Sequence, residues 1–162
     1  MANIFVIDAW NVCFKIPEIA TLIPDQLETA RNKFNISVKS YFSQKKITFK
    51  IIYDGQPDIY TNNSKRDPSI AFSRNPEKAD DLIIRYIQKQ SNKRDITVIT
   101  SDKQLAMRAK DLGAKVLSSD LFISRLQKRN VQAGKSFKQD PQIGEDEINY
   151  WLNKFSDDDQ RK

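Results

Sequence analysis

Short apolar segments alternate with longer amphipathic segments along most of the chain. The apolar segments show little alternation, which is typical of strands buried on both faces of a sheet. The longer segments place apolar side chains every three to four residues, which predicts helices that bury one face. The predicted strands are residues 3–8, 47–54, 69–73, 96–100 and 114–118, and the predicted helices are residues 25–43, 77–90, 102–112, 119–129 and 145–155.

Alternating strands and helices predict an α/β fold with a mostly parallel sheet and right-handed crossovers. We expect about five strands in one open sheet, flanked by helices in a three-layer arrangement. Residues 130–144 are polar, contain Gly134, Pro141 and Gly144, and are predicted to form a loop. A single domain is expected over residues 1–156, followed by a disordered tail at 157–162.

Two helix ends carry recognisable signals. Ser101 and Gln104 have the spacing of a capping box, and Gly113 stands where a glycine commonly follows a helix.

Cys13, Phe14 and Trp151 are expected in the core.

Acidic residues recur where predicted strands end. Asp8, Asp54 and Asp102 each follow a strand, and the pair Asp80–Asp81 opens a helix. In an open α/β sheet the carboxyl ends of the strands form the ligand-binding edge, so these side chains should converge. Two such charges ~4 Å apart repel by about 4 kcal/mol at an effective dielectric of about 20. The chain has no histidine, so we expect a hard divalent cation held by oxygen ligands to offset this repulsion.

Each acidic residue also has a purely local interpretation. Asp8 and Asn11 could stabilise a turn, Asp54 could form an Asp-Gly turn, and Asp102 could favour the start of a helix. We favour a site role for Asp8 and Asp102, with Asn11 supplying an amide that orients a carboxylate or a water, and leave Asp54 open between the two. Thr100, Ser101 and Asp81 are expected to lie just behind these groups.

Helical geometry separates Asp80 from Asp81. At about 100° per residue, Ile83, Ile84 and Ile87 lie within about 60° of Asp80, which places it beside the buried face. Asp81 points toward Arg85 and is expected at the surface. The helix dipole favours both residues alike, so only Asp80 is predicted to reach the site.

Composition narrows the function. The net charge is +6, which suits a polyanionic partner such as nucleic acid, although a lysine-rich solvated surface would give the same excess. The lack of histidine excludes Ser-His-Asp and Cys-His catalysis and histidine-ligated zinc, and no dinucleotide or P-loop fingerprint is present. A single cysteine, no membrane-length apolar run and no signal-like N-terminus predict a cytoplasmic protein. The RNA-binding side chains are expected to be Trp10, which could stack a base or pack in the core, with Lys65, Arg66, Arg74, Lys103, Lys135 and Lys138.

The order of these motifs resembles the YacP-like branch of NYN domains, within the PIN-like nuclease superfamily. The resemblance rests on IDAWNV, YDG, the KADDLI helix start, ITSD and the Trp-Leu-x-x-Phe helix, and covers roughly residues 3–155. It implies a Rossmann-like sheet and a Mg²⁺- or Mn²⁺-dependent endoribonuclease, and some relatives act on ribosome-associated messenger RNA. By this resemblance Asp8, Asn11, Asp80 and Asp102 match the acidic site positions, with Asp54 beside them. The pair Ala9-Trp10 departs from the small or Gly-Tyr pair that often precedes the asparagine.

We therefore expect an endoribonuclease that cleaves single-stranded RNA, with RNA and the ribosome as partners. One alternative is an RNA- or ribosome-binding module with a vestigial nuclease site. A second is a phosphoacceptor receiver domain, with Asp54 as acceptor and Thr100-Ser101 beyond a later strand.

Overall fold

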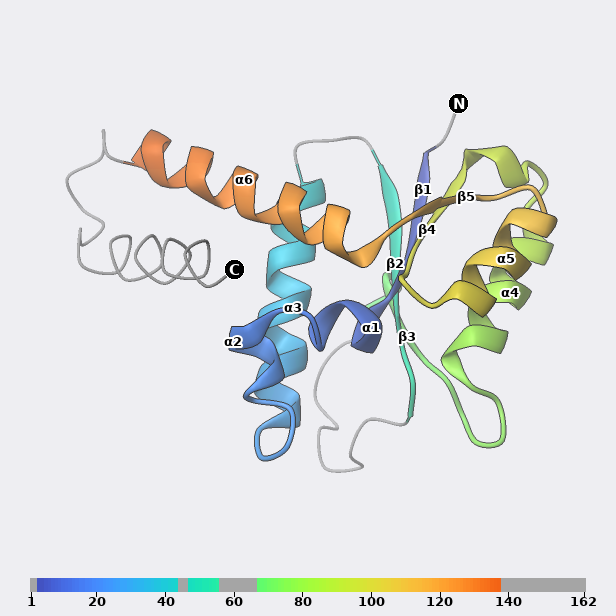
Figure 1. Cartoon of the computed structure of the whole chain (residues 1–162), viewed down its shortest axis with the longest axis horizontal. Helices are drawn as coiled ribbons and strands as arrows, with labels where there is room; N and C mark the ends of the chain where they lie inside the picture. The colour runs from blue at the N-terminus through green and yellow to red at the C-terminus, as the bar shows by residue number, and fades with distance from the viewer. Residues whose placement is uncertain (1–2, 44–46, 56–66, 138–162) are drawn as a thin grey trace. The chain divides into compact units, whose positions relative to one another are not determined.

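Five parallel strands form one sheet in the order β3-β2-β1-β4-β5. The computed structural model describes residues 3–43, 47–55 and 67–137 (Figure 1). The strands are β1 Ile4–Asp8, β2 Thr48–Tyr53, β3 Ile70–Phe72, β4 Ile96–Ile99 and β5 Lys115–Leu117. All five predicted strands are confirmed, each within two residues of its expected ends.

The helices connect these strands in the predicted alternation. They are α1 Ala9–Cys13, α2 Pro17–Ala20, α3 Leu27–Phe42, α4 Ala79–Lys89, α5 Lys103–Asp111 and α6 Ser119–Phe137, with a 3₁₀ turn at Lys93–Asp95. Gly113 follows α5 with φ +100°, a conformation that favours glycine, so the predicted stop signal is confirmed.

The strand order fixes where a ligand site belongs. The chain runs from β1 through β2 to β3 on one side and then returns to place β4 on the other side of β1. This is the Rossmann order, and its topological switch point lies between β1 and β4. A receiver domain has the order 2-1-3-4-5 instead. The receiver-like alternative is therefore wrong.

Strand register brings the ends of β1 and β4 together. Ile7 of β1 pairs with Ile99 of β4, so Asp8 and Thr100 follow side by side at the carboxyl edge. On its other side, Asp8 pairs with Ile52 of β2, two residues before Asp54. Residues remote in sequence thus reach the switch point because both neighbouring strands run parallel to β1.

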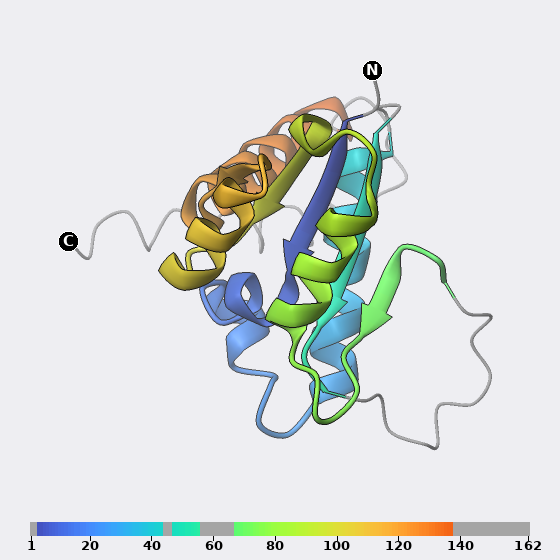
Figure 2. The ribbon, with the colours of Figure 1, turned by 90° about the vertical axis from the view of Figure 1, so that its right-hand side faces the viewer.

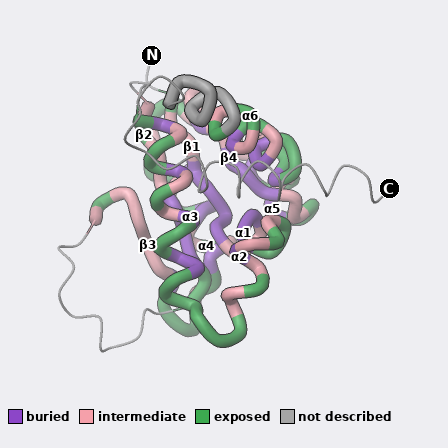
Figure 3. Tube along the Cα trace, turned by 90° about the vertical axis from the view of Figure 1, so that its left-hand side faces the viewer, coloured by how far each residue is buried: buried purple, intermediate pink, exposed green. Residues whose placement is uncertain are grey.

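Apolar side chains fill both faces of the sheet. Helices α4 and α5 lie on one side of the sheet (Figure 2). There Ile83, Ile87 and Leu105 pack in one core cluster with Val6 and Val98. On the opposite face, α3 turns its buried residues to the sheet and its exposed residues to solvent, as the alternating colours along it show (Figure 3). Burial on both faces explains why the strand sequences are continuously apolar.

Aromatic rings make up much of the α3 side of the core. The ring of Phe42 lies 5.1 Å from the rings of both Phe5 and Phe49, and Tyr53 lies 5.4 Å from Phe72. The Tyr53 hydroxyl donates a 2.7 Å hydrogen bond to Asn35 Oδ1 on α3. This bond satisfies a fully buried hydroxyl. It also fixes the end of β2, directly before Asp54, to α3.

Several sequence expectations need correction. Helix α6 continues to Phe137, so the loop prediction was wrong for residues 130–137; the run between Arg129 and Phe137 holds mostly residues that helices accept, and one interior glycine costs only about 1 kcal/mol. Helices α1 and α2 were not predicted, because each is too short to show periodicity. Cys13 is buried, but Phe14 is 62% exposed because it caps the far end of α1.

The chain divides into two compact units, Met1–Ile123 and Ser124–Lys162. The first holds the whole sheet, and the described residues of the second are the remainder of α6. The expected helix at 145–155 with Trp151, and the expected tail at 157–162, lie outside the described residues. Within the described ranges, no helix is both long and apolar enough to span a bilayer.

Candidate active site

Four acidic residues meet around the switch point of the sheet. Asp8 ends β1, Asp54 follows β2, Asp80 lies in the first turn of α4 and Asp102 precedes α5. The charges of Asp54, Asp80 and Asp102 all act on Asp8, and those of Asp54 and Asp102 act on Asp80. The predicted convergence of the acidic residues is therefore present in the fold.

Asp8 is the buried member of this group. Its residue is only 8% exposed, and its Oδ2 accepts a 2.9 Å hydrogen bond from the Thr100 hydroxyl. Asp8 occupies the N-cap position of α1, yet its side chain makes no capping bond. The turn interpretation thus does not account for this carboxylate, which points across to β4 instead.

The pKa of Asp8 is raised from 3.8 to about 6, and burial is the largest cause. The hydrogen bond from Thr100 lowers the pKa, and the nearby charges of Asp80, Asp102 and Asp54 add to the rise that burial produces, all within this net value. Burial also raises the pKa of Asp80, with Asp102 as the next cause, while Arg108 lowers it. The edge therefore favours the uptake of positive charge, whether a proton or a cation.

The raised pKa of Asp8 predicts how stability depends on pH. Between about pH 4 and pH 6, folded Asp8 holds a proton that the unfolded chain has released, so the free energy of unfolding falls as pH rises. The loss from this group is up to about 3 kcal/mol and is complete above about pH 6. Urea unfolding with chelator present should show Asp8→Asn gaining stability over the wild type across this window. A difference that does not change with pH would contradict the assignment.

Asp102 caps α5 directly. Its Oδ1 accepts hydrogen bonds from the backbone N–H groups of Gln104, at 2.9 Å, and Leu105, at 3.1 Å. The prediction that Ser101 caps this helix was wrong by one residue. Asp102 stands at the N-cap because its extended backbone lets a short carboxylate reach the second and third N–H groups. The cap uses Oδ1, so Oδ2 is not committed to the helix, and a role as ligand stays a prediction.

Asp54 ties together the turn after β2. Its Oδ1 accepts hydrogen bonds from the Ser73 hydroxyl, at 2.8 Å, and from the Ala79 N–H at the start of α4, at 3.1 Å. The Ser73 hydroxyl also accepts from the N–H of Gly55, whose φ is +96°. Gly55 has the positive φ that an Asp-Gly turn predicts, but the Asp54 carboxylate bonds to residues 19 and 25 positions away. Asp54 therefore positions the start of the helix that carries Asp80.

Asp80 and Asp81 differ in exposure as helical geometry predicted. Asp80 is half-buried and lies among the acidic residues, whereas Asp81 is exposed. Asp81 pairs with Arg108 of α5 at 3.4 Å, rather than with Arg85, which pairs with Glu77 at 3.0 Å. Arg108 thus lies close enough to act on both aspartates, and the sequence pattern did not single it out.

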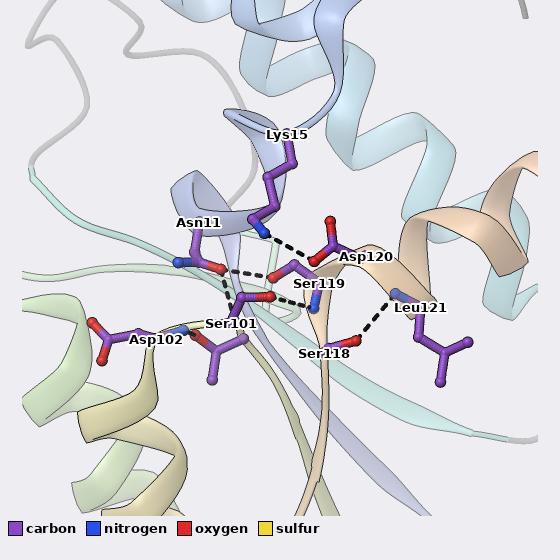
Figure 4. A network of polar contacts seen from close by, with 9 residues as sticks. Asn11, Lys15, Ser101, Asp102, Ser118, Ser119, Asp120 and Leu121 are labelled. Carbon is purple, nitrogen blue, oxygen red and sulfur yellow. Dashed lines mark hydrogen bonds and ion pairs between the residues drawn. The ribbon is translucent and has the colours of Figure 1, made fainter. Parts of the chain in front are cut away.

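A hydrogen-bond network joins α1, the segment after β4 and the start of α6 (Figure 4). Asn11 Oδ1 accepts from the Ser101 N–H at 2.9 Å and from the Ser119 hydroxyl at 2.7 Å. The Ser119 N–H donates to Ser101 Oγ at 3.0 Å. Thr100 Oγ1 accepts from the Asp102 N–H at 3.1 Å while its hydroxyl donates to Asp8. Thr100 thus contacts Asp8 directly, whereas Ser101 bonds to Asn11 and Ser119, and the supporting role expected of both stays a prediction.

Trp10 is half-buried and held at the same edge. Its indole Nε1 donates a 3.0 Å hydrogen bond to the Asp54 carbonyl, and its ring lies 4.9 Å from Tyr53. Of the expected RNA-binding cations, Arg74 and Lys103 are exposed. Lys65, Arg66 and Lys138 lie outside the described residues, and Lys135 lies on α6 with no description of its side chain.

Two buried serines at this edge were missed by the sequence interpretation. Ser73 follows β3 and is 1% exposed, and Ser119 follows β5 by two residues and is fully buried. Both obey the rule that identified the aspartates, namely a polar residue close to the carboxyl end of a strand. Extending that rule from acidic to hydroxyl side chains would have found them.

The donor chemistry of the edge suits a hard cation, because carboxylate oxygens are the ligands that Mg²⁺ and Mn²⁺ prefer. The raised pKa of Asp8 agrees, since a cation would relieve the repulsion that contributes to it. The spacing is wider than a closed coordination shell: across the described ranges, no three acidic or cysteine side chains are grouped tightly enough to hold one ion.

Three comparisons place the chain among known proteins. Residues 5–161 match the family model described as YacP-like NYN domain. The structure is similar to Rae1 (YacP) from Bacillus subtilis, with 20% identity, a TM-score of 0.67, and coverage of 94% of this chain and 92% of that one. A single-residue variant of the same protein gives 19% identity, a TM-score of 0.67, and coverage of 93% and 92%. No curated protein matches the chain.

Proposed function

The chain belongs to the YacP-like NYN domain family, whose members are nuclease-like and RNA-related, and from this premise we propose that it is a metal-dependent endoribonuclease acting on single-stranded RNA. The observation that carries the proposal is the placement of Asp8. This carboxylate is nearly buried, caps no helix and lies at the topological switch point beside three other aspartates. Burying it there lowers the stability of the fold. Such strain is typical of a functional site.

Asp8, Asp80 and Asp102 would hold Mg²⁺ or Mn²⁺ partly through water molecules, as their wide spacing requires, with Asp54 at the border of the site. When bound, the ion would supply a Lewis acid that acidifies water and offsets negative charge on the scissile phosphate. Thr100 fixes the Asp8 carboxylate through its hydroxyl, and the α5 cap fixes Asp102. Asp54 holds the start of α4, which presents Asp80 to the same edge.

Cationic side chains would hold the RNA backbone next to this acidic edge. Lys103 and Arg74 are exposed on segments that flank Asp102 and Asp54. Arg108 lies near Asp80 and would balance part of its charge. An acidic centre with a positive surround attracts a polyanion while keeping the divalent cation at the reacting phosphate, and RNA affinity should fall steeply with salt. A ribosome-bound messenger RNA is one source of such a single strand.

Cleavage tests the proposal against the binding-module alternative. Single-stranded RNA labelled at one end should be cut internally by the wild type with Mn²⁺, and left intact with chelator. Binding measured by anisotropy with chelator present reports RNA affinity separately. Binding without internal cleavage under any divalent ion would favour a binding module with a vestigial site.

Divalent metal should raise the melting temperature of the wild type. An ion that binds only the folded state at about 100 times its Kd adds about 2.7 kcal/mol. We expect a larger shift with Mn²⁺ than with Mg²⁺, and a shift with Ca²⁺ accompanied by little cleavage. Differential scanning fluorimetry of the wild type and Asp8→Asn checks this, because the variant should lose most of the shift. Equal shifts in both proteins would place the ion elsewhere.

A further inference from the structure

Ser119 is a fully buried serine with two hydrogen bonds that reach the candidate active site. It is 0% exposed and begins α6, two residues after the end of β5. Its hydroxyl donates to Asn11 Oδ1 at 2.7 Å, and its N–H donates to Ser101 Oγ at 3.0 Å. These bonds join residues that lie 108 and 18 positions apart in the sequence.

The contacts determine which way the Asn11 amide faces. The Ser101 N–H can only donate, so the Asn11 atom 2.9 Å from it must be the carbonyl oxygen. The Ser119 hydroxyl donates to that same oxygen. With both donors on Oδ1, the Nδ2 group is turned to the side away from Ser119, as Figure 4 shows. Asn11 therefore presents hydrogen-bond donors, rather than an acceptor, on its other side.

The neighbouring serine has a different role, although it shares the chemistry. Ser118 Oγ accepts a 3.2 Å hydrogen bond from the Leu121 N–H, which is the capping contact of α6. Ser118 is exposed, and its hydroxyl bonds within its own helix start. Of the two adjacent serines, Ser118 caps the helix and Ser119 contacts the site.

We propose that Ser119 is a positioning residue of the endoribonuclease site, acting through Asn11. The inference rests on the proposed function and deepens it. The Ser119 hydroxyl holds the Asn11 carbonyl oxygen inward, so that the Nδ2 hydrogens donate toward the acidic edge, where they orient a substrate phosphate oxygen or a water. Ser119 itself touches neither RNA nor the reacting atoms.

The kinetic test compares four variants by single-turnover RNA cleavage. Ser119→Ala should lower the cleavage rate roughly 10- to 100-fold, because a misoriented donor loses its alignment with the reacting group. Ser118→Ala, the matched control, should lower the melting temperature and leave the cleavage rate unchanged. Asn11→Ala should lose as much activity as Ser119→Ala or more. Adding Ser119→Ala to Asn11→Ala should then cost nothing further, because the residue it acts through is gone.

A second readout does not depend on activity. The ¹H–¹⁵N signals of the Asn11 side-chain amide should shift or broaden in Ser119→Ala and stay in place in Ser118→Ala. Ser119→Cys keeps the shape of the side chain with a slightly larger atom and loses the strong donor, and it replaces the alanine variant if that variant does not fold.

The outcomes separate the inference from the proposed function. Failure of the wild type to cleave any RNA removes the proposed function. With an active wild type, the inference is overturned by a Ser119→Ala rate equal to that of the wild type, by additive losses in the double variant, or by unchanged Asn11 amide signals.

Discussion

Asp8→Asn should abolish RNA cleavage while leaving the fold and RNA binding intact. We expect the single-turnover rate to fall by at least about 10³-fold, which corresponds to about 4 kcal/mol of transition-state stabilisation. The side chain keeps its size and can still accept the hydrogen bond from Thr100. What it loses is the charge at the centre of the acidic edge, so the effect should fall on chemistry rather than on folding.

The same substitution should stabilise the protein when no metal is present. Above about pH 6 the wild type keeps a buried carboxylate ionised against burial and three like charges, a cost of up to about 3 kcal/mol that asparagine avoids. A variant that is both inactive and more stable is the signature of a functional carboxylate. Asp120→Asn is the control for removing one carboxylate charge, and it should change neither cleavage nor stability much. Asp120 is exposed and pairs only at the surface, with Lys15 at 2.9 Å. Cleavage by Asp8→Asn near the wild-type rate would remove Asp8 from the mechanism.

Asp80→Asn should damage cleavage far more than Asp81→Asn does. The two residues share the first turn of α4, the same helix dipole and the same chemistry. Asp80 is half-buried among the acidic residues, so its loss should cost several kcal/mol, at about 1.36 kcal/mol for each tenfold in rate. Asp81 is exposed and makes one surface ion pair with Arg108, and such pairs contribute about 0–1 kcal/mol.

This pair of variants is its own matched control. Both proteins should be compared by single-turnover cleavage of one RNA at saturating Mn²⁺, together with their unfolding by urea. Asp81→Asn should lose about tenfold in rate or less. Equal losses, or a larger loss from Asp81→Asn, would mean that the charge near Arg108 matters more than the charge facing Asp8, and the site would have to be moved toward α5.

Elements with a clear pattern of apolar positions in the sequence were predicted correctly. Continuous apolar runs gave the five strands, because a strand between two helical layers must be apolar on both faces. The 3.6-residue period around Ile83 and Ile87 gave both α4 and the different directions of Asp80 and Asp81. Helices α1 and α2 were missed because they are too short to show a helical period. The end of α6 was misplaced because the helix tolerates an interior glycine.

Caps were harder to predict, because several neighbours have suitable chemistry. Ser101 and Asp102 can each accept from a helix N-terminus, and the sequence pattern favoured Ser101. In the structure the Ser101 hydroxyl accepts the Ser119 N–H, and its own N–H donates to Asn11. Asp102 therefore caps α5. The competition was decided by Ser119 at the start of α6 and Asn11 in α1, which no local pattern around Ser101 contains.

The sequence by itself determined the alternation of strands and helices and the appearance of acidic residues at strand ends, because both follow from burial and chain direction within a few residues. Only the tertiary structure decided the strand order that places Asp8 beside Thr100 at the switch point and rules out the receiver arrangement. It also decided the partners of Asn11, since Ser119 lies 108 residues away and meets it only when β5 is laid beside β4. Side-chain identity determines which bonds a residue can form, and long-range strand pairing determines the partner with which it forms them.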